Sequence, residues 1–115
     1  KSPAVQVVAV EPASSPLLTK GVAGSHGLQG IGAGFIPAVL DVSVMDEVVT
    51  VTDDEAYAAG RMMGRREGVL VGISSGAALH AAIEIAKRPD MAGKHVVVLL
   101  PDTGDRYLST PLFAD

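Results

Sequence analysis

The hydrophobic positions of this chain gather in four short runs that we predict to be buried β-strands. The runs cover residues 5–10, 47–51, 69–72 and 95–100. Each is rich in β-branched residues and almost continuously apolar, whereas a strand with one wet face would alternate apolar and polar residues. The pattern therefore predicts a sheet that is covered on both sides.

A helix is predicted between the second and third runs, because both of its ends carry recognisable signals. Thr52 and Glu55 have the spacing of a capping box, with Thr52 as the N-cap residue. Arg65 and Arg66 fall in the last turn, where cations suit the helix dipole. Gly68 follows as the expected C-cap.

A second helix is predicted from Ser74 and Ser75 to about Lys87. Its polar residues, such as His80 and Glu84, form only a narrow stripe, and alanine and isoleucine fill most of the remaining surface. A helix that is apolar over most of its circumference is mostly buried. Its many alanines allow close approach to a sheet or to another helix.

The order of strands and helices predicts an α/β fold: a mostly parallel sheet with helices on both faces, joined by right-handed crossovers. Ligands in such folds bind at the carboxyl ends of the strands, so the turns after the strands are the informative places. A long stretch, residues 12–44, separates the first two strands and contains six glycines. Loops of that length inside one domain tend to be functional or mobile.

Composition narrows the functional classes. The 115 residues amount to one domain, and 48% hydrophobic residues are enough to fill a core. A net charge of -4 argues against nucleic-acid binding. The chain has no cysteine, which excludes disulfides, a thiolate nucleophile and a cysteine-ligated zinc site. The three histidines lack metal-ligand spacing, and no apolar run approaches the roughly 20 residues of a membrane helix.

The start of the chain is unusual, because Lys1 is neither an initiator methionine nor part of a signal-peptide pattern. We therefore expect the chain to be a piece of a longer protein.

Glycines at positions 30, 32 and 34 have the spacing G-x-G-x-G, which differs from the dinucleotide-binding pattern G-x-G-x-x-G. Alternating glycines either allow close backbone packing and positive φ, or let the backbone approach a ligand. The spacing by itself favours the first interpretation.

Residues 72–76 form a turn from strand to helix and fit the G-x-S-x-G pattern of a nucleophile elbow. A serine hydrolase would also need a histidine and an acid at the same end of the sheet. His26 lies in the long loop, His80 on the polar stripe of a helix, and His95 at the opposite end. We therefore favour another role, in which one serine caps the helix and the other offers its hydroxyl to a ligand.

The segment after the last strand contains Asp102 and Asp105, which could bind a metal ion or pair with Arg106. Such a run is more often a turn with a local ion pair. A Schiff-base lysine needs burial or a cationic neighbour to lower its pKa, and the sequence surroundings predict neither for any of the four lysines. These are Lys1, Lys20, Lys87 and Lys94.

Several separated motifs together closely resemble the cysteine synthase (O-acetylserine sulfhydrylase) family. They are QGIGAGFIP at residues 29–37, GISSGAA at 72–78 and RYLST at 106–110, supported by VAVEP at 8–12 and AKRP at 86–89. The resemblance covers almost the whole chain, in the right order, but only the C-terminal part of the family's chain. It implies that residues 1–115 form a single C-terminal fragment or domain of a longer two-domain, fold-type II pyridoxal-phosphate enzyme, similar to the tryptophan synthase β-subunit.

The resemblance also implies roles for particular residues. Ser74 would hydrogen-bond the pyridine nitrogen of pyridoxal 5'-phosphate, and Pro101 would border the ring, with Asp102 carried over only weakly. Gln29 and Gly30 would face the bound amino acid. The family's Schiff-base lysine is expected upstream, so this chain would contain no catalytic residue and be inactive alone.

The implied activity is that of a transferase in cysteine biosynthesis, which converts O-acetyl-L-serine and sulfide to L-cysteine and acetate. Alternatives are cystathionine β-synthase, a sulfhydrylase that uses O-phosphoserine, or a non-catalytic α/β binding module. The glycine-rich loop has Lys20 but no arginine for a phosphate leaving group, which favours O-acetylserine. The implied partners are the N-terminal part of the same enzyme, a second copy in a homodimer, and the C-terminal tail of serine acetyltransferase, in the cytoplasm, with no nucleic acid and no membrane.

Overall fold

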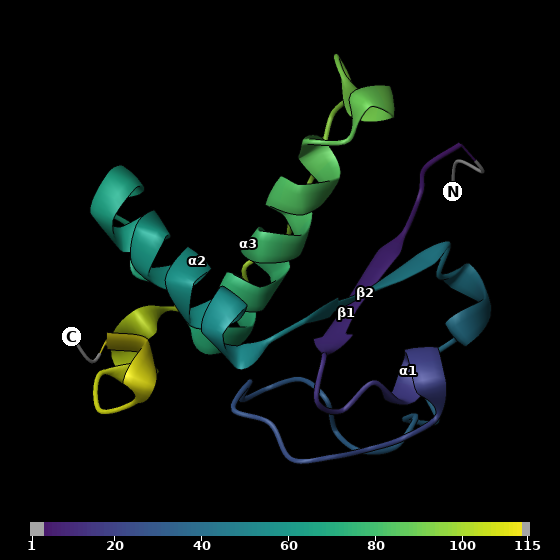
Figure 1. Cartoon of the computed structure of the whole chain (residues 1–115), viewed down its shortest axis with the longest axis horizontal. Coiled ribbons are helices and arrows are strands. Elements are labelled where there is room, and N and C mark those ends of the chain that lie inside the picture. Colours follow the sequence, from purple (N-terminus) through teal and green to yellow (C-terminus); the bar gives the residue numbers. More distant parts are fainter. Residues whose placement is uncertain (1–3, 114–115) are drawn as a thin grey trace.

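A two-stranded parallel sheet with helices packed beside it forms the centre of the fold (Figure 1). The computed structural model describes residues 4–113, apart from the side chain of Arg106. Strand β1 (Val8–Pro12) pairs with β2 (Glu47–Val51) over its full length, with Val8 opposite Glu47 and Pro12 opposite Val51. The predicted α/β class with a parallel sheet is confirmed.

In the sequence, helix α1 lies between the two strands, and α2 and α3 follow β2. Within the described residues, none is long and apolar enough to cross a membrane. Figure 1 shows α2 beside α3, with α3 nearer to the strands. The α-helices are α1 (Leu17–Lys20), α2 (Asp53–Glu67) and α3 (Ile73–Ala86), and the short 3-10 turns are η1 (Val42–Val44), η2 (Pro89–Met91), η3 (Gly104–Tyr107) and η4 (Pro111–Phe113).

Helix α2 has the ends that the sequence predicts. The Thr52 hydroxyl accepts a hydrogen bond from the Glu55 N–H at 3.1 Å, and the Glu55 carboxylate accepts one from the Thr52 N–H at 2.9 Å. Gly68 ends the helix in the left-handed conformation, with φ of 71°. The capping box and the glycine C-cap are therefore confirmed.

The start of α3 differs from the expectation that a serine caps it. The N-cap residue is Gly72 in extended conformation, and no side chain caps the helix. Ser74 and Ser75 already lie inside the first turn, because the helix begins one residue earlier, at Ile73. Neither hydroxyl is therefore used as the N-cap.

Three of the four predicted strands also need correction. The first one begins later than expected, at Val8, and extends to Pro12. Of residues 69–72, only Val71 forms an isolated antiparallel bridge, with Thr103. Residues 95–100 form no ladder within the described chain, since nothing there pairs with them. Only the 47–51 strand is observed as predicted.

Helices α2 and α3 approach each other closely at two glycines. A Cβ atom added at Gly76 would overlap the carbonyl oxygen of Ala56 and lie 3.2 Å from the nitrogen of Gly60. Only glycine allows this crossing, so the second glycine of the G-x-S-x-G pattern serves helix packing.

The buried core lies between this helix pair, the long loop and the C-terminal segment. Tyr107 and Leu112 fold back onto the helices, and Arg61 of α2 donates hydrogen bonds to the carbonyls of Pro111 and Leu112. The core residues are Leu28, Val51, Ala56, Ile73, Ala77, Ala81, Tyr107 and Leu112.

Candidate functional site

The two adjacent serines at the start of α3 have different surroundings. The Ser75 hydroxyl is fully buried and donates to the carbonyl of Asp102 at 3.3 Å. The Ser74 side chain is only 7% exposed, yet its hydroxyl has no hydrogen-bond partner within residues 4–113. Because this oxygen is not among the fully buried side-chain atoms and forms no hydrogen bond in the described chain, a ligand can reach it, and the Ser74 hydroxyl is a candidate ligand-binding group.

The long glycine-rich loop passes directly in front of Ser74. A Cβ atom at Gly30 would lie 3.6 Å from Ser74 Oγ, so at this point loop backbone faces the hydroxyl. Gly30 has φ of 97°, which side-chain-bearing residues rarely adopt. The positive φ agrees with the first interpretation of the alternating glycines, in which they serve backbone conformation and packing.

Helix α2 anchors this loop. The Asp53 carboxylate accepts a hydrogen bond from the Gly27 N–H at 2.8 Å, and the Tyr57 hydroxyl donates to the Gly27 carbonyl at 3.1 Å. Burial raises the pKa of Tyr57, with smaller contributions from the nearby Asp53 and Asp54 carboxylates, so the phenol stays a donor. The two hydrogen bonds connect residues that are 26 and 30 positions apart in the sequence.

His26 lies in the same loop and joins two parts of it. Its Nδ1 accepts a hydrogen bond from the Leu28 N–H at 3.1 Å, and its Nε2 lies 2.9 Å from the Gly32 carbonyl oxygen. An acceptor at Nδ1 and a carbonyl at Nε2 assign the proton to Nε2. His26 therefore holds the turn around Gly30 and does not face a ligand.

The start of the loop is fixed by Glu11, at the end of β1. This carboxylate is buried and accepts hydrogen bonds from the Leu18 and Thr19 N–H groups of α1, at 2.7 and 2.9 Å. The Thr19 hydroxyl donates to it as well. These donors account for a buried carboxylate that has no other described role.

Asp102 forms the other side of the α3 N-terminus. Its carbonyl accepts from the Gly72 N–H at 3.2 Å, and Tyr107 donates its hydroxyl proton to Oδ2 at 2.5 Å. A Cβ at Gly72 would overlap Oδ1, so glycine is required there. Oδ1 itself is buried and has no partner. This carboxylate therefore combines a fixed position with one unused acceptor.

The structure brings only part of the predicted site together. Ser74 and Gly30 are neighbours, as described above. Gln29 is exposed in the same loop, and Pro101 is exposed one residue before Asp102. No hydrogen bond in the described part of the chain joins Gln29 or Pro101 to Ser74.

The hydrolase interpretation and a lysine nucleophile gain no support from the geometry. Ser74 lies in a regular helix, whereas a nucleophile elbow places its serine in a strained turn. No histidine bonds to Ser74 within residues 4–113. Lys20, Lys87 and Lys94 are exposed, and Lys1 lies outside the described residues.

Sequence reasoning missed three residues that shape the site: Asp53, Tyr57 and Tyr107. The first two were assigned only to the helix, and Tyr107 only to a motif. Asp53 and Tyr57 bond to the Gly27 backbone, 26 and 30 positions away, which no spacing rule identifies, whereas Tyr107 bonds to the Asp102 side chain only five residues away. A buried tyrosine usually finds a partner for its hydroxyl, which was the one available signal.

The fold and these atoms define an α/β domain that presents a serine hydroxyl without a partner in residues 4–113, and a glycine loop in front of it, at the carboxyl end of its strands. Residues 1–102 match the family model described as pyridoxal-phosphate dependent enzyme. The chain belongs to this family.

Individual relatives are consistent with this family assignment. The chain is 49% identical over 112 residues to a cysteine synthase of Staphylococcus aureus, covering 97% of this chain and 36% of that protein. It is similar to the crystal structure of an Entamoeba histolytica cysteine synthase, with a TM-score of 0.94, 38% identity, and 97% of this chain and 33% of the other covered. For isoform 3 of the same organism's O-acetyl serine sulfhydrylase, the TM-score is 0.92 at 43% identity, covering 95% and 32%. The chain spans about a third of the length of the relatives it matches.

The residues present fit the family's cofactor, pyridoxal phosphate. The cofactor's pyridine nitrogen can accept a hydrogen bond, and Ser74 Oγ is an accessible donor without a partner in the described chain. A flat ring also needs a wall without side chains, and Gly30 provides such a surface opposite Ser74.

Proposed function

We propose that this chain is the C-terminal part of a cysteine synthase, a transferase of cysteine biosynthesis. The complete enzyme replaces the acetoxy group of O-acetyl-L-serine with sulfide, giving L-cysteine and acetate. The S. aureus and E. histolytica relatives support this assignment, because their likeness extends over nearly all of this chain. A non-catalytic binding module is not favoured, since the relatives that match nearly all of this chain are cysteine synthases.

The observation that carries the proposal is the Ser74 hydroxyl at the start of α3. In our proposal it donates a hydrogen bond to the pyridine nitrogen, and Pro101 borders the ring. Pyridoxal phosphate, when bound, supplies an electron sink for the substrate's α-carbon. A neutral hydroxyl leaves the pyridine nitrogen unprotonated, so the ring withdraws electrons only moderately. This suits β-replacement better than transamination.

Gln29 and Gly30 are proposed to bind the amino-acid substrate. Gln29 is exposed, so its amide can donate to a carboxylate and accept from an amine. Gly30 brings its backbone close to Ser74, so a substrate bound at Gly30 would lie beside a cofactor held by Ser74. The bonds from Asp53 and Tyr57 to Gly27 hold the loop in position for this contact.

The Schiff-base lysine is proposed to lie in the N-terminal part of the same enzyme, because the described lysines of this chain are exposed. That part is therefore a required partner, and residues 1–115 by themselves are proposed to be inactive. In this proposal the chain is the C-terminal portion of a two-domain enzyme, with residues 1–115 as one unit.

The resemblance to cysteine synthases also supports a homodimer, a cytoplasmic location and docking of the serine acetyltransferase tail. O-acetylserine is favoured as substrate, since the loop has no arginine for a phosphate leaving group.

The test is an assay of the longer enzyme with O-acetylserine and sulfide, following cysteine formation, together with the visible absorbance of bound cofactor. We expect both, and we expect Ser74→Ala to reduce cofactor affinity. A longer enzyme that binds no pyridoxal phosphate and makes no cysteine would refute the proposal. An active enzyme that prefers O-phosphoserine or homocysteine would instead change the substrate.

A further inference from the structure

The glycine-rich loop reverses direction in a tight turn formed by residues 28–31. The Ile31 N–H donates a hydrogen bond to the Leu28 carbonyl at 3.3 Å. Gly30 has a positive φ of 97°, of the kind that type II turns place at their third residue. Gln29, the second residue, is exposed, whereas Leu28 is fully buried in the core. The turn therefore presents Gln29 and Gly30 on a base that is fixed in the protein interior.

One side chain, that of His26, connects the two sides of this turn. Its Nδ1 accepts from the Leu28 N–H at 3.1 Å on one side, and its Nε2 donates to the Gly32 carbonyl at 2.9 Å on the other. A Cβ atom at Gly32 would lie 2.6 Å from His26 Nε2 and 2.6 Å from Pro12 Cγ. The imidazole is therefore packed closely against Gly32, and it sets the distance between the two sides of the turn.

This pair of hydrogen bonds requires a neutral imidazole. With a proton on Nε2 only, one ring nitrogen accepts and the other donates, which matches the two backbone groups. A second proton, on Nδ1, would point at the Leu28 N–H, so that two donors would face each other and this hydrogen bond would be lost. The bond to the Gly32 carbonyl would remain, because Nε2 keeps its proton. Protonation of His26 therefore releases the side of the turn that precedes Gln29.

The other titratable groups near His26 act on different parts of the loop. Helix α2 contributes Asp53 and Tyr57, which are both bonded to the backbone of Gly27. Strand β1 contributes Glu11, whose carboxylate is bonded to N–H groups of α1. No ion pair joins His26 to another side chain within residues 4–113. The base of the loop is thus held independently of the imidazole, and a change at His26 affects the turn alone.

We propose that His26 is a positioning residue for the amino-acid substrate. Its neutral ring holds Gln29 and Gly30 in the binding conformation, and its protonation weakens substrate binding without weakening cofactor binding. The proposal rests on the proposed function, which assigns substrate binding to these two residues. Ser74, the proposed cofactor contact, lies on α3 and forms no hydrogen bond with the described loop, so the two affinities can change separately. A turn that adopts the binding conformation only part of the time lowers the apparent affinity by that fraction.

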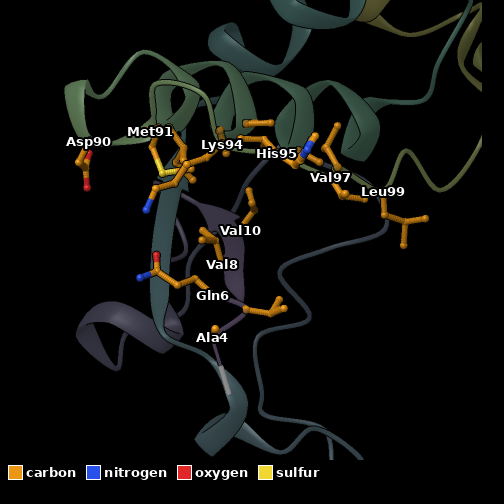
Figure 2. Close-up of a pocket in the computed structure, with 17 residues that line it drawn as sticks. Ala4, Gln6, Val8, Val10, Asp90, Met91, Lys94, His95, Val97 and Leu99 are labelled. Carbon is orange, nitrogen blue, oxygen red and sulfur yellow. The ribbon is translucent and has the colours of Figure 1, made fainter. Parts of the chain in front are cut away.

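The test uses the longer enzyme with His26→Ala, which removes both hydrogen bonds, and His26→Asn, which keeps an acceptor near the position of Nδ1. His95→Ala is the control, because His95 lines an apolar pocket between α3 and β1 to which no described residue of the loop contributes (Figure 2). At about pH 7.5 we expect His26→Ala to raise KM for O-acetylserine about five- to tenfold, with kcat and cofactor affinity changed less than about twofold. His26→Asn should recover part of this loss.

The pH dependence separates positioning by a neutral ring from a general loss of structure. Histidine changes its charge between about pH 5 and pH 8, so the unmodified enzyme should lose the bond to Leu28 at about pH 5.5. The ratio of KM between His26→Ala and the unmodified enzyme should then fall at least about twofold from its value at about pH 7.5. Substrate and cofactor titrate alike in both proteins, so this ratio isolates His26. For His95→Ala the ratio should stay near one at both pH values.

Amide hydrogen exchange of the cofactor-loaded enzyme, without substrate, gives a measurement that does not depend on turnover. Relative to intrinsic rates, residues 27–32 should exchange about fivefold faster in His26→Ala, and α3 should be unchanged. A KM ratio that is equal at the two pH values, unchanged exchange in the turn, or a parallel loss of cofactor affinity would each overturn the role of His26. An enzyme that converts no O-acetylserine, although its turn exchanges faster in His26→Ala, would instead refute the proposed function.

Discussion

Gly30 and Ser74 face each other, and a Cβ added at the glycine would lie 3.6 Å from the serine Oγ. This distance is an ordinary contact, so the cost of a substitution at Gly30 comes mainly from its φ of 97°. The two residues are 44 positions apart, and the loop backbone meets the hydroxyl without a side chain between them.

Gly30→Ala should therefore reduce both stability and cofactor binding. We expect a loss of about 1–2 kcal/mol in the free energy of unfolding, because an L-residue is strained at this φ. The new methyl group would also cover the Ser74 hydroxyl. Gly34→Ala is the matched control, because Gly34 has φ of 83° and its Cβ would contact only Ala23 at 3.9 Å. Urea unfolding should give similar losses, with cofactor affinity reduced only at Gly30. Equal affinities in the two variants would contradict the proximity argument.

Ser74→Ala and Ser75→Ala should affect different properties. Ser75→Ala removes a buried hydrogen bond to the Asp102 carbonyl and should cost about 1 kcal/mol of stability. Ser74→Ala removes a hydroxyl without a described partner, so stability should change by less than about 0.5 kcal/mol. Cofactor titration should show a dissociation constant raised about tenfold for Ser74→Ala only. The reverse pattern would show that Ser75 is the ligand-binding serine.

Tyr107→Phe should destabilise the loop beside α3. The variant leaves the Asp102 carboxylate, whose Oδ1 already has no partner, without its 2.5 Å hydrogen bond at Oδ2. We expect a loss of about 1.5–3 kcal/mol, as for other hydrogen bonds to charged groups. Tyr57→Phe is the comparison, since its 3.1 Å bond goes to the neutral Gly27 carbonyl and should be worth about 0.5–1.5 kcal/mol. Thermal unfolding that ranks the two variants the other way would argue against this account of Asp102.

The capping box of α2 should make stability depend on acid pH. The hydrogen bond from the Thr52 N–H lowers the pKa of Glu55 below its ordinary value of 4.5, and His80, 3.2 Å away, contributes further. Because the folded-state pKa is lowered, the stabilisation is present above 4.5 and is lost as pH falls through the folded pKa. Urea unfolding at about pH 7 and about pH 3.5 should show a smaller pH-dependent loss for Glu55→Gln than for the unmodified protein. Equal losses would show that Glu55 is not responsible.

Local signals predicted the fold where the interactions themselves are local. Thr52, Glu55 and Gly68 mark the ends of α2 correctly, since a capping box and a glycine C-cap involve residues only a few positions apart. The start of α3 was misplaced by one residue because a glycine N-cap leaves no side-chain signal. Periodicity and composition identified residues 95–100 as strand-like, but pairing requires a neighbour that the described chain does not contain.

The candidate site was predictable only in part for the same reason. The family resemblance singled out Ser74 and Gly30, and the structure places them together. Which serine bonds to Asp102 depends on the position of a segment 27 residues away, and sequence spacing cannot give this information. The contact between His26 and the Gly32 carbonyl was not predictable either, because the turn that brings them together is not regular secondary structure.

The glycine contact between α2 and α3 has a consequence for how such enzymes can vary. Gly76 lies only two residues beyond Ser74 on the same helix. The distance between α2 and α3 therefore also determines the position of the serine hydroxyl. A larger residue at Gly76 would overlap the Ala56 carbonyl, push α3 outwards and carry the hydroxyl with it. Substitutions at this helix crossing, where two backbones only pack against each other, would then also change catalysis.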